Sequence, residues 1–141
     1  MDNRPNFNYI SINPLKTEIE VMWHYTTFYR KKENGRIACY IPSFDIHFTA
    51  DNIDACREKS NGLTAIFFDH FLESGIKNGM KQLVLNLHRL GFRSIQDSMV
   101  MKDFAHNKVI KAKFTGNIPS IPYGFSENQK IESQSKLAMA V

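Results

Sequence analysis

The segment from Glu33 to Leu63, ENGRIACYIPSFDIHFTADNIDACREKSNGL, constrains the fold more than any other stretch of the chain. Asn34-Gly35 predicts a two-residue type I′ hairpin turn, because both residues accept positive φ. Pro42 cannot donate a ladder hydrogen bond, so it ends or bends the strand before it. The order of turn, strand, bend, short strand and capped helix predicts an antiparallel meander followed by a helix.

Alternating side chains define the three strands of this meander. From Ile19 to Arg30, β-branched and aromatic residues recur at every second position, which predicts a strand with one well-buried face. The inward positions of the three strands are Ile19, Val21, Trp23, Tyr25 and Tyr29, then Ile37, Cys39 and Ile41, then Ile46 and Phe48. The outward Tyr40, Asp45, His47 and Thr49 form either a recognition surface or only the wet face of the sheet.

Two helices are expected after the meander. Thr49 and Asp51 are both candidate N-caps of the first, which runs to about Ser74-Gly75. Ser60-Asn61-Gly62 either lets this helix approach the sheet closely or kinks it. Its sheet-facing residues are expected to be Ile53, Cys56, Leu63, Ile66, Phe67 and Phe71.

The second helix has the clearest helical periodicity in the chain. Its apolar face runs from Ile76 through Met80, Leu83, Val84 and Leu87 to Leu90. Gly91 is expected at the C′ position, with Phe92 as the apolar contact just beyond it.

The 141 residues fit one α+β domain with an appendage at each end. We expect an N-terminal arm (1–17) that either adds a short edge strand or lies on the surface, then the domain (18–114), and an extended or disordered tail (115–141). VIKAKF, residues 109–114, supplies a last strand. The predicted architecture is an antiparallel three-stranded meander packed by one or two helices, in the order β-β-β-α-α-β.

Composition excludes several protein classes. Hydrophobic residues make up 43% of the chain, which is incompatible with a wholly disordered protein. The apolar run AIFF is far shorter than the roughly 20 residues that a membrane-spanning helix needs. The N-terminus lacks the apolar region of a signal peptide, so the expected location is cytoplasmic. Cys39 and Cys56 are expected to be reduced, mostly buried thiols.

Basic charge is concentrated in one part of the chain. Residues 77–114 carry eight Lys/Arg against two Asp, whereas residues 1–76 carry eight Lys/Arg against ten Asp/Glu. This asymmetry indicates either an anionic partner, for which phosphate contact requires converging positive charges, or a solvated face that only maintains solubility. The candidate residues for binding nucleic acid or a partner protein are Lys81, His88, Arg89, Arg93, Lys111 and Lys113.

No catalytic motif is visible in the sequence. Phosphate-binding, dinucleotide-binding, zinc-protease and nucleophile-elbow patterns are missing, and none of the five histidines pair at i, i+4. We therefore expect no catalytic residues, no metal site and no cofactor, and a protein that is not an enzyme.

Residues 19–73 resemble the core of the HicB-like antitoxins. On that match Pro42 stands at the family's proline, Phe44-Asp45 in its acidic and aromatic link, and Thr49 at its threonine. Residues 51–55 stand at the start of its helix. The resemblance implies a partial ribonuclease-H-like β-β-β-α core and a small, non-catalytic regulatory protein. It also implies a partner, a basic RNA-cleaving toxin, and operator DNA binding through a C-terminal module.

The sequence thus predicts a non-catalytic, HicB-like regulatory or antitoxin-type binding protein that engages a toxin-like protein or nucleic acid. The alternative is a structural or oligomerising domain that does not bind nucleic acid. A homo-oligomer fits either prediction, and no membrane association is expected.

Overall fold

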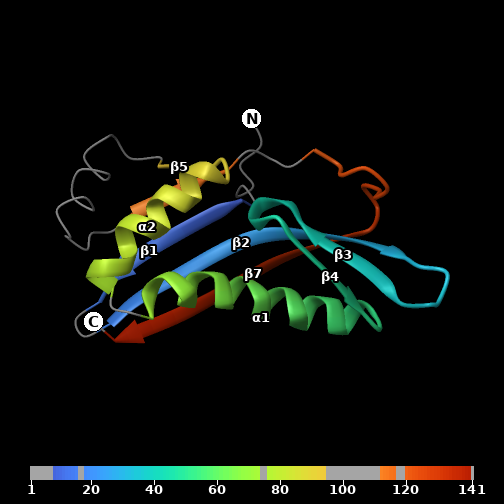
Figure 1. The fold of residues 1–141 in the computed structure, drawn as a ribbon, viewed down its shortest axis with the longest axis horizontal. Helices are drawn as coiled ribbons and strands as arrows, with labels where there is room; N and C mark the ends of the chain where they lie inside the picture. Colours follow the sequence, from blue (N-terminus) through green and yellow to red (C-terminus); the bar gives the residue numbers. More distant parts are fainter. Residues whose placement is uncertain (1–7, 16–17, 74–75, 95–111, 117–119, 141) are drawn as a thin grey trace.

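The computed structural model describes residues 8–15, 18–73, 76–94, 112–116 and 120–140. The fold is α+β, with both helices on the same side of one antiparallel sheet (Figure 1). The elements are β1 (Tyr9–Pro14), β2 (Glu18–Lys31), β3 (Ile37–Ile41), the 3₁₀ turn η1 (Pro42–Phe44), β4 (Ile46–Ala50), α1 (Ile53–Leu72), α2 (Ile76–Arg89), β5 (Arg93–Ser94), β6 (Ala112–Thr115) and β7 (Lys130–Ala140).

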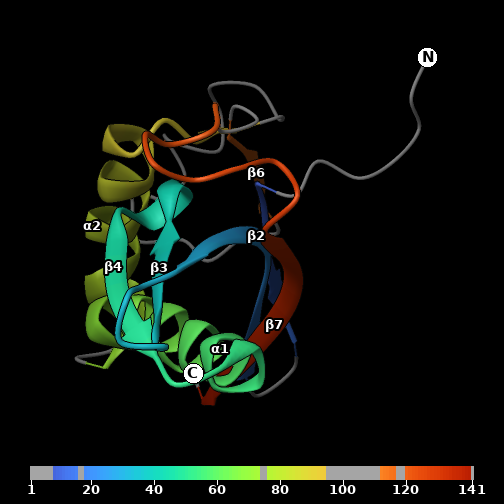
Figure 2. The same ribbon diagram turned by 90° about the vertical axis from the view of Figure 1, so that its right-hand side faces the viewer.

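Strand β2 is the centre of the sheet. The strand order is β4-β3-β2-β1-β6-β5, and β7 lies on the other edge of β2. One edge of β2 pairs with β1 over residues 19–24 and with β3 over residues 28–31, while the opposite edge pairs with β7 over residues 18–28. The sheet bends along β2, and its concave side holds the helices (Figure 2).

The predicted meander is present as β2–β3–β4, but it is part of a seven-stranded sheet. The N-terminal arm supplies β1, which lies between β2 and β6 and is not an edge strand. The region expected to be a tail supplies β7. Its inward positions include Ser133 and Ser135, so it lacks the apolar alternation by which β2 was predicted. Of the predicted strand 109–114, residues 112–114 lie in β6, and residues 109–111 lie outside the described residues.

The hairpin between β2 and β3 has a three-residue loop, not the predicted two-residue one. The Gly35 amide donates to the Lys32 carbonyl over 3.1 Å, and the Lys32 amide donates to the Arg36 carbonyl over 2.7 Å. Gly35 has φ of +85°, whereas Asn34 is not left-handed. A type I turn followed by a left-handed glycine gives this bulged hairpin, so only the glycine is required by its backbone angle.

The two predictions for the segment after β3 had different outcomes. Pro42 ends β3 as expected and begins η1. The N-cap of α1 is Asn52, not Thr49 or Asp51: its side chain accepts a hydrogen bond from the Ala55 amide over 2.8 Å. Asp51 instead lies 3.1 Å from Arg36 Nε.

Helix α1 packs on the sheet through small and polar residues. The buried residues recur every four positions along the helix, as Cys56, Ser60, Thr64, Phe68 and Leu72. Trp23 Nε1 donates to Thr64 Oγ1 over 2.9 Å, and Thr27 Oγ1 donates to Ser60 Oγ over 3.0 Å. The helix is continuous through Ser60-Asn61-Gly62, and within this tripeptide only the small Ser60 is buried against β2.

The predicted apolar face of α1 was therefore partly wrong. Ile53 is 43% exposed and Ile66 is 64% exposed. The spacing of hydrophobic residues did not identify the buried face of α1. That face carries Ser60 and Thr64, which form hydrogen bonds with Thr27 and Trp23 on β2.

Helix α2 agrees with its prediction. Met80, Leu83, Val84 and Leu87 are buried in the core. Gly91 has φ of +98°, its amide donates to the His88 carbonyl, and the Phe92 amide donates to the Leu87 carbonyl over 2.9 Å. This is a Schellman motif with Phe92 buried beyond it. Among the described residues, no helix has the length and apolar character needed to cross a lipid bilayer.

Replacement by alanine is expected to have opposite effects on stability at the two helical glycines Gly79 and Gly62. A Cβ on Gly79 would lie 1.5 Å from the Phe71 carbonyl oxygen, whereas a Cβ on Gly62 would meet no atom within 4 Å. We expect Gly79→Ala to lower the free energy of unfolding by about 3 kcal/mol or more, because α2 must move away from α1. Gly62→Ala should raise it by about 0.5–1 kcal/mol. Urea denaturation of both variants measures this, and similar midpoints would contradict the α1–α2 packing.

The hydrogen bond between Trp23 and Thr64 gives a second prediction. Thr64→Val keeps the shape of the side chain but leaves the buried Trp23 Nε1 without its acceptor. We expect a loss of about 1–3 kcal/mol in the free energy of unfolding. Thr115→Val, the same change on half-buried β6, is the control and should stay within about 0.5 kcal/mol of wild type. Equal effects of the two variants would refute the role of the bond.

Candidate functional site

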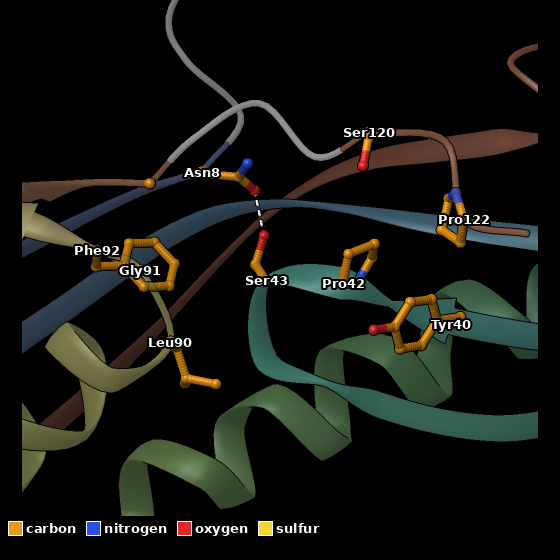
Figure 3. A pocket seen from close by; sticks show the side chains of 10 residues that line it. Asn8, Tyr40, Pro42, Ser43, Leu90, Gly91, Phe92, Ser120 and Pro122 are labelled. Atoms are coloured by element: carbon orange, nitrogen blue, oxygen red, sulfur yellow. Dashed lines mark hydrogen bonds between the residues drawn. The ribbon is translucent and has the colours of Figure 1, made fainter.

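A surface cleft of about 530 Å³ opens where β1 begins, beside η1 and the end of α2. Figure 3 shows Ser120 and Pro122 on one side of it and Tyr40 and Leu90 opposite. Five separate segments of the chain build the cleft, so tertiary folding alone creates it. Its lining residues are Asn8, Tyr40, Pro42, Ser43, Leu90, Gly91, Phe92, Gly116, Ser120 and Pro122.

Backbone contacts hold the floor of the cleft in place. The Gly116 amide donates to the Asn8 carbonyl over 2.7 Å. A Cβ on Gly116 would lie 3.2 Å from Asn8 Cβ and 3.3 Å from the Phe92 ring, so glycine suits this close approach. The Schellman motif that ends α2 sets the position of Phe92.

A buried side-chain hydrogen bond joins β1 to η1 across the cleft. Ser43 Oγ donates to Asn8 Oδ1, as the dashed line in Figure 3 shows. Asn8 is 2% exposed and Ser43 is 9% exposed, so the bond is shielded from water. It connects the first strand to the turn between β3 and β4, which keeps the two walls of the cleft together.

Tyr40 lines the cleft together with Pro42, and Asp45 and His47 contact Tyr40; these three residues are called the rim below. The Tyr40 and His47 rings stack with centroids 4.0 Å apart and planes 16° apart. The Tyr40 hydroxyl donates to Asp45 Oδ1 over 3.1 Å, and His47 Nε2 lies 3.8 Å from the same oxygen. Asp45 has φ of +52°, a left-handed conformation that aspartate tolerates better than most residues.

The electrostatics of this rim keep the tyrosine protonated. Burial raises the pKa of the Tyr40 hydroxyl, and the Asp45 carboxylate, which accepts its hydrogen bond, raises it further. At neutral pH the group is therefore a hydrogen-bond donor and not a base.

The loop before β7 extends the aromatic rim. The Phe125 ring lies 6.3 Å from the Tyr40 ring, and the Arg30 guanidinium carbon lies 5.4 Å from the Phe125 centroid. Tyr123, on the same loop, is fully exposed. The rim thus combines aromatic rings with one cation close to them.

The metal-binding and nucleophilic groups of the described residues can be placed individually. No group of three or more His, Cys, Asp or Glu within them is arranged to hold a metal ion. Burial raises the pKa of both the Cys39 and the Cys56 thiols, which keeps them protonated and poorly nucleophilic. Among the described residues that line the cleft, Tyr40 alone has an ionisable side chain.

The predicted basic residues are divided between two faces of the molecule. Lys81 and Arg89 are exposed on α2, His88 is partly buried there, and Arg93 follows on β5. Arg93 Nη1 lies 3.4 Å from the His88 carbonyl oxygen, so its charge faces the negative end of α2. This groups four of the six residues near one helix.

Lys113 is not part of this group. It lies on β6 between Ala112 and Phe114, which are both buried in the core under the helices. Because neighbouring strand residues point to opposite faces, Lys113 lies on the sheet face away from α2. Lys111 lies outside the described residues.

Sequence reasoning points to one described lining residue of the cleft. The outward set Tyr40, Asp45, His47 and Thr49 includes Tyr40, which lines the cleft and contacts Asp45 and His47. The predicted binding residues that the structure describes are not among the lining residues; they are Lys81, His88, Arg89, Arg93 and Lys113. Sequence reasoning missed Asn8, Ser43 and Ser120. Only the hydroxyl or amide character of these residues was visible, and their meeting depends on long-range packing.

Comparison with known proteins gives no further guide. No protein-family model matches the chain, and no curated protein or solved structure is significantly similar to it.

Proposed function

We propose that the protein is a non-catalytic binding protein whose cleft takes an unpaired nucleotide of a single-stranded nucleic acid. The observation that carries this proposal is the composition of the cleft and its borders. Its lining is neutral, aromatic and hydroxyl-bearing, and its segment from Leu90 to Phe92 lies between Arg89 and Arg93 in the chain.

The cleft has the size and chemistry that suit a base with its sugar. Its volume of about 530 Å³ falls among small-ligand sites. Unpaired bases bind proteins by stacking on aromatic rings and by hydrogen bonds from neutral groups. Tyr40 offers an aromatic ring, whereas its hydroxyl proton and that of Ser43 are already donated to Asp45 and Asn8. Ser120 adds an exposed hydroxyl.

Positive charge next to the cleft supports phosphate contact. Arg89 and Arg93 are exposed and flank the lining segment 90–92 in the chain, and Arg30 lies over the Phe125 ring. Backbone phosphates supply sequence-independent affinity when such cations are within reach. Arg89 and Arg93, which the sequence predicted to bind nucleic acid, thus belong to the same end of α2 as the lining residues 90–92.

The proposal leads to a binding prediction centred on Tyr40. Tyr40→Ala should weaken binding of a short labelled single-stranded RNA by about tenfold, because one stacked base contributes about 1–3 kcal/mol. Tyr40→Phe keeps the ring and should retain most of the affinity. Arg89→Ala and Arg93→Ala should each reduce the salt dependence of binding. Fluorescence anisotropy at low and at physiological ionic strength measures all four variants.

The matched control is Arg57→Ala. Arg57 is an exposed arginine on α1 that pairs with Asp54 over 3.3 Å, and it does not line the cleft. Its removal should leave affinity nearly unchanged. Absence of binding by the wild type at low salt, or an equal loss in the Arg57 variant, would reject the nucleotide site.

A second candidate is the antitoxin-type role that the HicB-like resemblance implies. It is favoured by the order β2–β3–β4–α1, which spans the resembling residues. In this role the protein would bind a basic, RNA-cleaving toxin-like partner in the cytoplasm, a location that stays a prediction.

Co-expression with the product of an adjacent short reading frame tests this second role. We expect a stable complex that survives gel filtration and suppresses any growth defect caused by the partner alone. If the partner is neither bound nor neutralised, the antitoxin role is abandoned, whatever the RNA measurements show.

A further inference from the structure

The outer edge of β7 is open along the described part of the sheet. Over 11 residues, β7 pairs with β2 alone, and α1 packs on its inner face (Figures 1 and 2). The other two edge strands, β4 and β5, have five and two residues. A long edge strand with unpaired backbone groups is a template for pairing with another strand.

Hydrogen-bond geometry shows which backbone groups face this edge. The Tyr29 amide donates to the Gln129 carbonyl over 3.0 Å, in register with the β2–β7 ladder. In an antiparallel pair, residues that bond the neighbour alternate with residues whose amide and carbonyl point the other way. The odd-numbered residues of β7 therefore bond β2. The even-numbered ones, from Lys130 to Ala138, direct their amides and carbonyls outward.

Two copies of β7 can pair only in registers that bring even-numbered residues opposite one another. A two-fold axis through Ser133 would place Lys130 opposite Lys136, a repulsive pair. An axis through Ser135 would place Glu132 opposite Ala138. An axis through Gln134 places Glu132 opposite Lys136 twice, once on each side of the axis.

The register centred on Gln134 also pairs residues of similar polarity on the sheet face that carries the helices. It sets Ile131 opposite Leu137 and Ser133 opposite Ser135. Ile131 is 8% exposed, whereas Leu137 is only partly buried within one chain. A second copy would therefore cover apolar surface as well as pair opposite charges.

We propose that the partner at this edge is a second copy of the chain, joined by antiparallel β7–β7 pairing centred on Gln134. One sheet then runs through both copies, with the helices of both on the same side. None of the residues that line the cleft lies on β7, so both clefts remain open. The two-fold contact is self-complementary, as expected for a closed dimer.

Charge exchange at the paired positions tests this inference. Glu132→Lys and Lys136→Glu each place like charges opposite one another, and each should raise the dimer dissociation constant about tenfold. The double variant, Glu132→Lys with Lys136→Glu, restores opposite charges and should recover wild-type association. Sedimentation equilibrium of the full chain over a range of concentrations measures the constants.

Gln134→Pro provides an independent variant. The Gln134 backbone amide points away from β2, so proline removes no backbone hydrogen bond of the sheet, although it removes the side-chain bond from Gln134 to Met22 Sδ. It blocks the central pair of the interface. This variant should be monomeric with an unchanged far-ultraviolet circular dichroism spectrum. Glu20→Lys, on β2, is the control and should remain dimeric. A monomeric wild type, or failure of the double variant to restore association lost in the single ones, would overturn the inference.

Discussion

The hydrogen bonds between β2 and α1 are the contacts on which the rest of the structure depends. Trp23 and Thr27 bond Thr64 and Ser60 at 2.9 and 3.0 Å, all within the buried interior. A buried donor without an acceptor is costly, so these bonds set both the depth and the rotation of the helix on the sheet. With α1 fixed, Phe68 packs against Trp23, with ring centroids 4.5 Å apart. Gly79 then lets α2 cross close to the end of α1.

The cleft and the outer edge of β7 lie on opposite sides of β2. One edge pairs first with β1 and then with β3, and the cleft forms where the start of β1 meets the turn after β3. The opposite edge pairs with β7, whose outer side carries the self-complementary charges. The proposed pairing of two copies would therefore not compete with ligand entry at the cleft. An oligomerising role and the proposed binding function would be compatible in one molecule.

Sequence patterns predicted those elements whose buried face is apolar. Alternation identified β2, β3 and β4, and helical periodicity identified α2 together with its ending at Gly91. The same reasoning predicted helix α1 but misplaced part of its buried face, and it missed β7; Ser60, Thr64, Ser133 and Ser135 occupy inward positions there. Those residues face partners distant in sequence; Ser133, for example, lies opposite Tyr25 in the register of β2 and β7. Sequence patterns could not pair Asn8 with Ser43 for the same reason. Their side chains form a hydrogen bond between segments that are far apart in the sequence.

The two surfaces also determine what kind of ligand the protein would favour. A dimer presents two clefts in fixed relation, so a ligand long enough to reach both binds the second cleft intramolecularly, at a raised effective concentration. A mononucleotide gains nothing from this arrangement, because it occupies one cleft at a time. In the proposed function, the neutral lining of each cleft would supply modest affinity, and the nearby arginines would contact the phosphates between bases. The proposed dimer would therefore prefer extended single strands to free nucleotides because it has two clefts. This preference would need no residue that recognises a particular base.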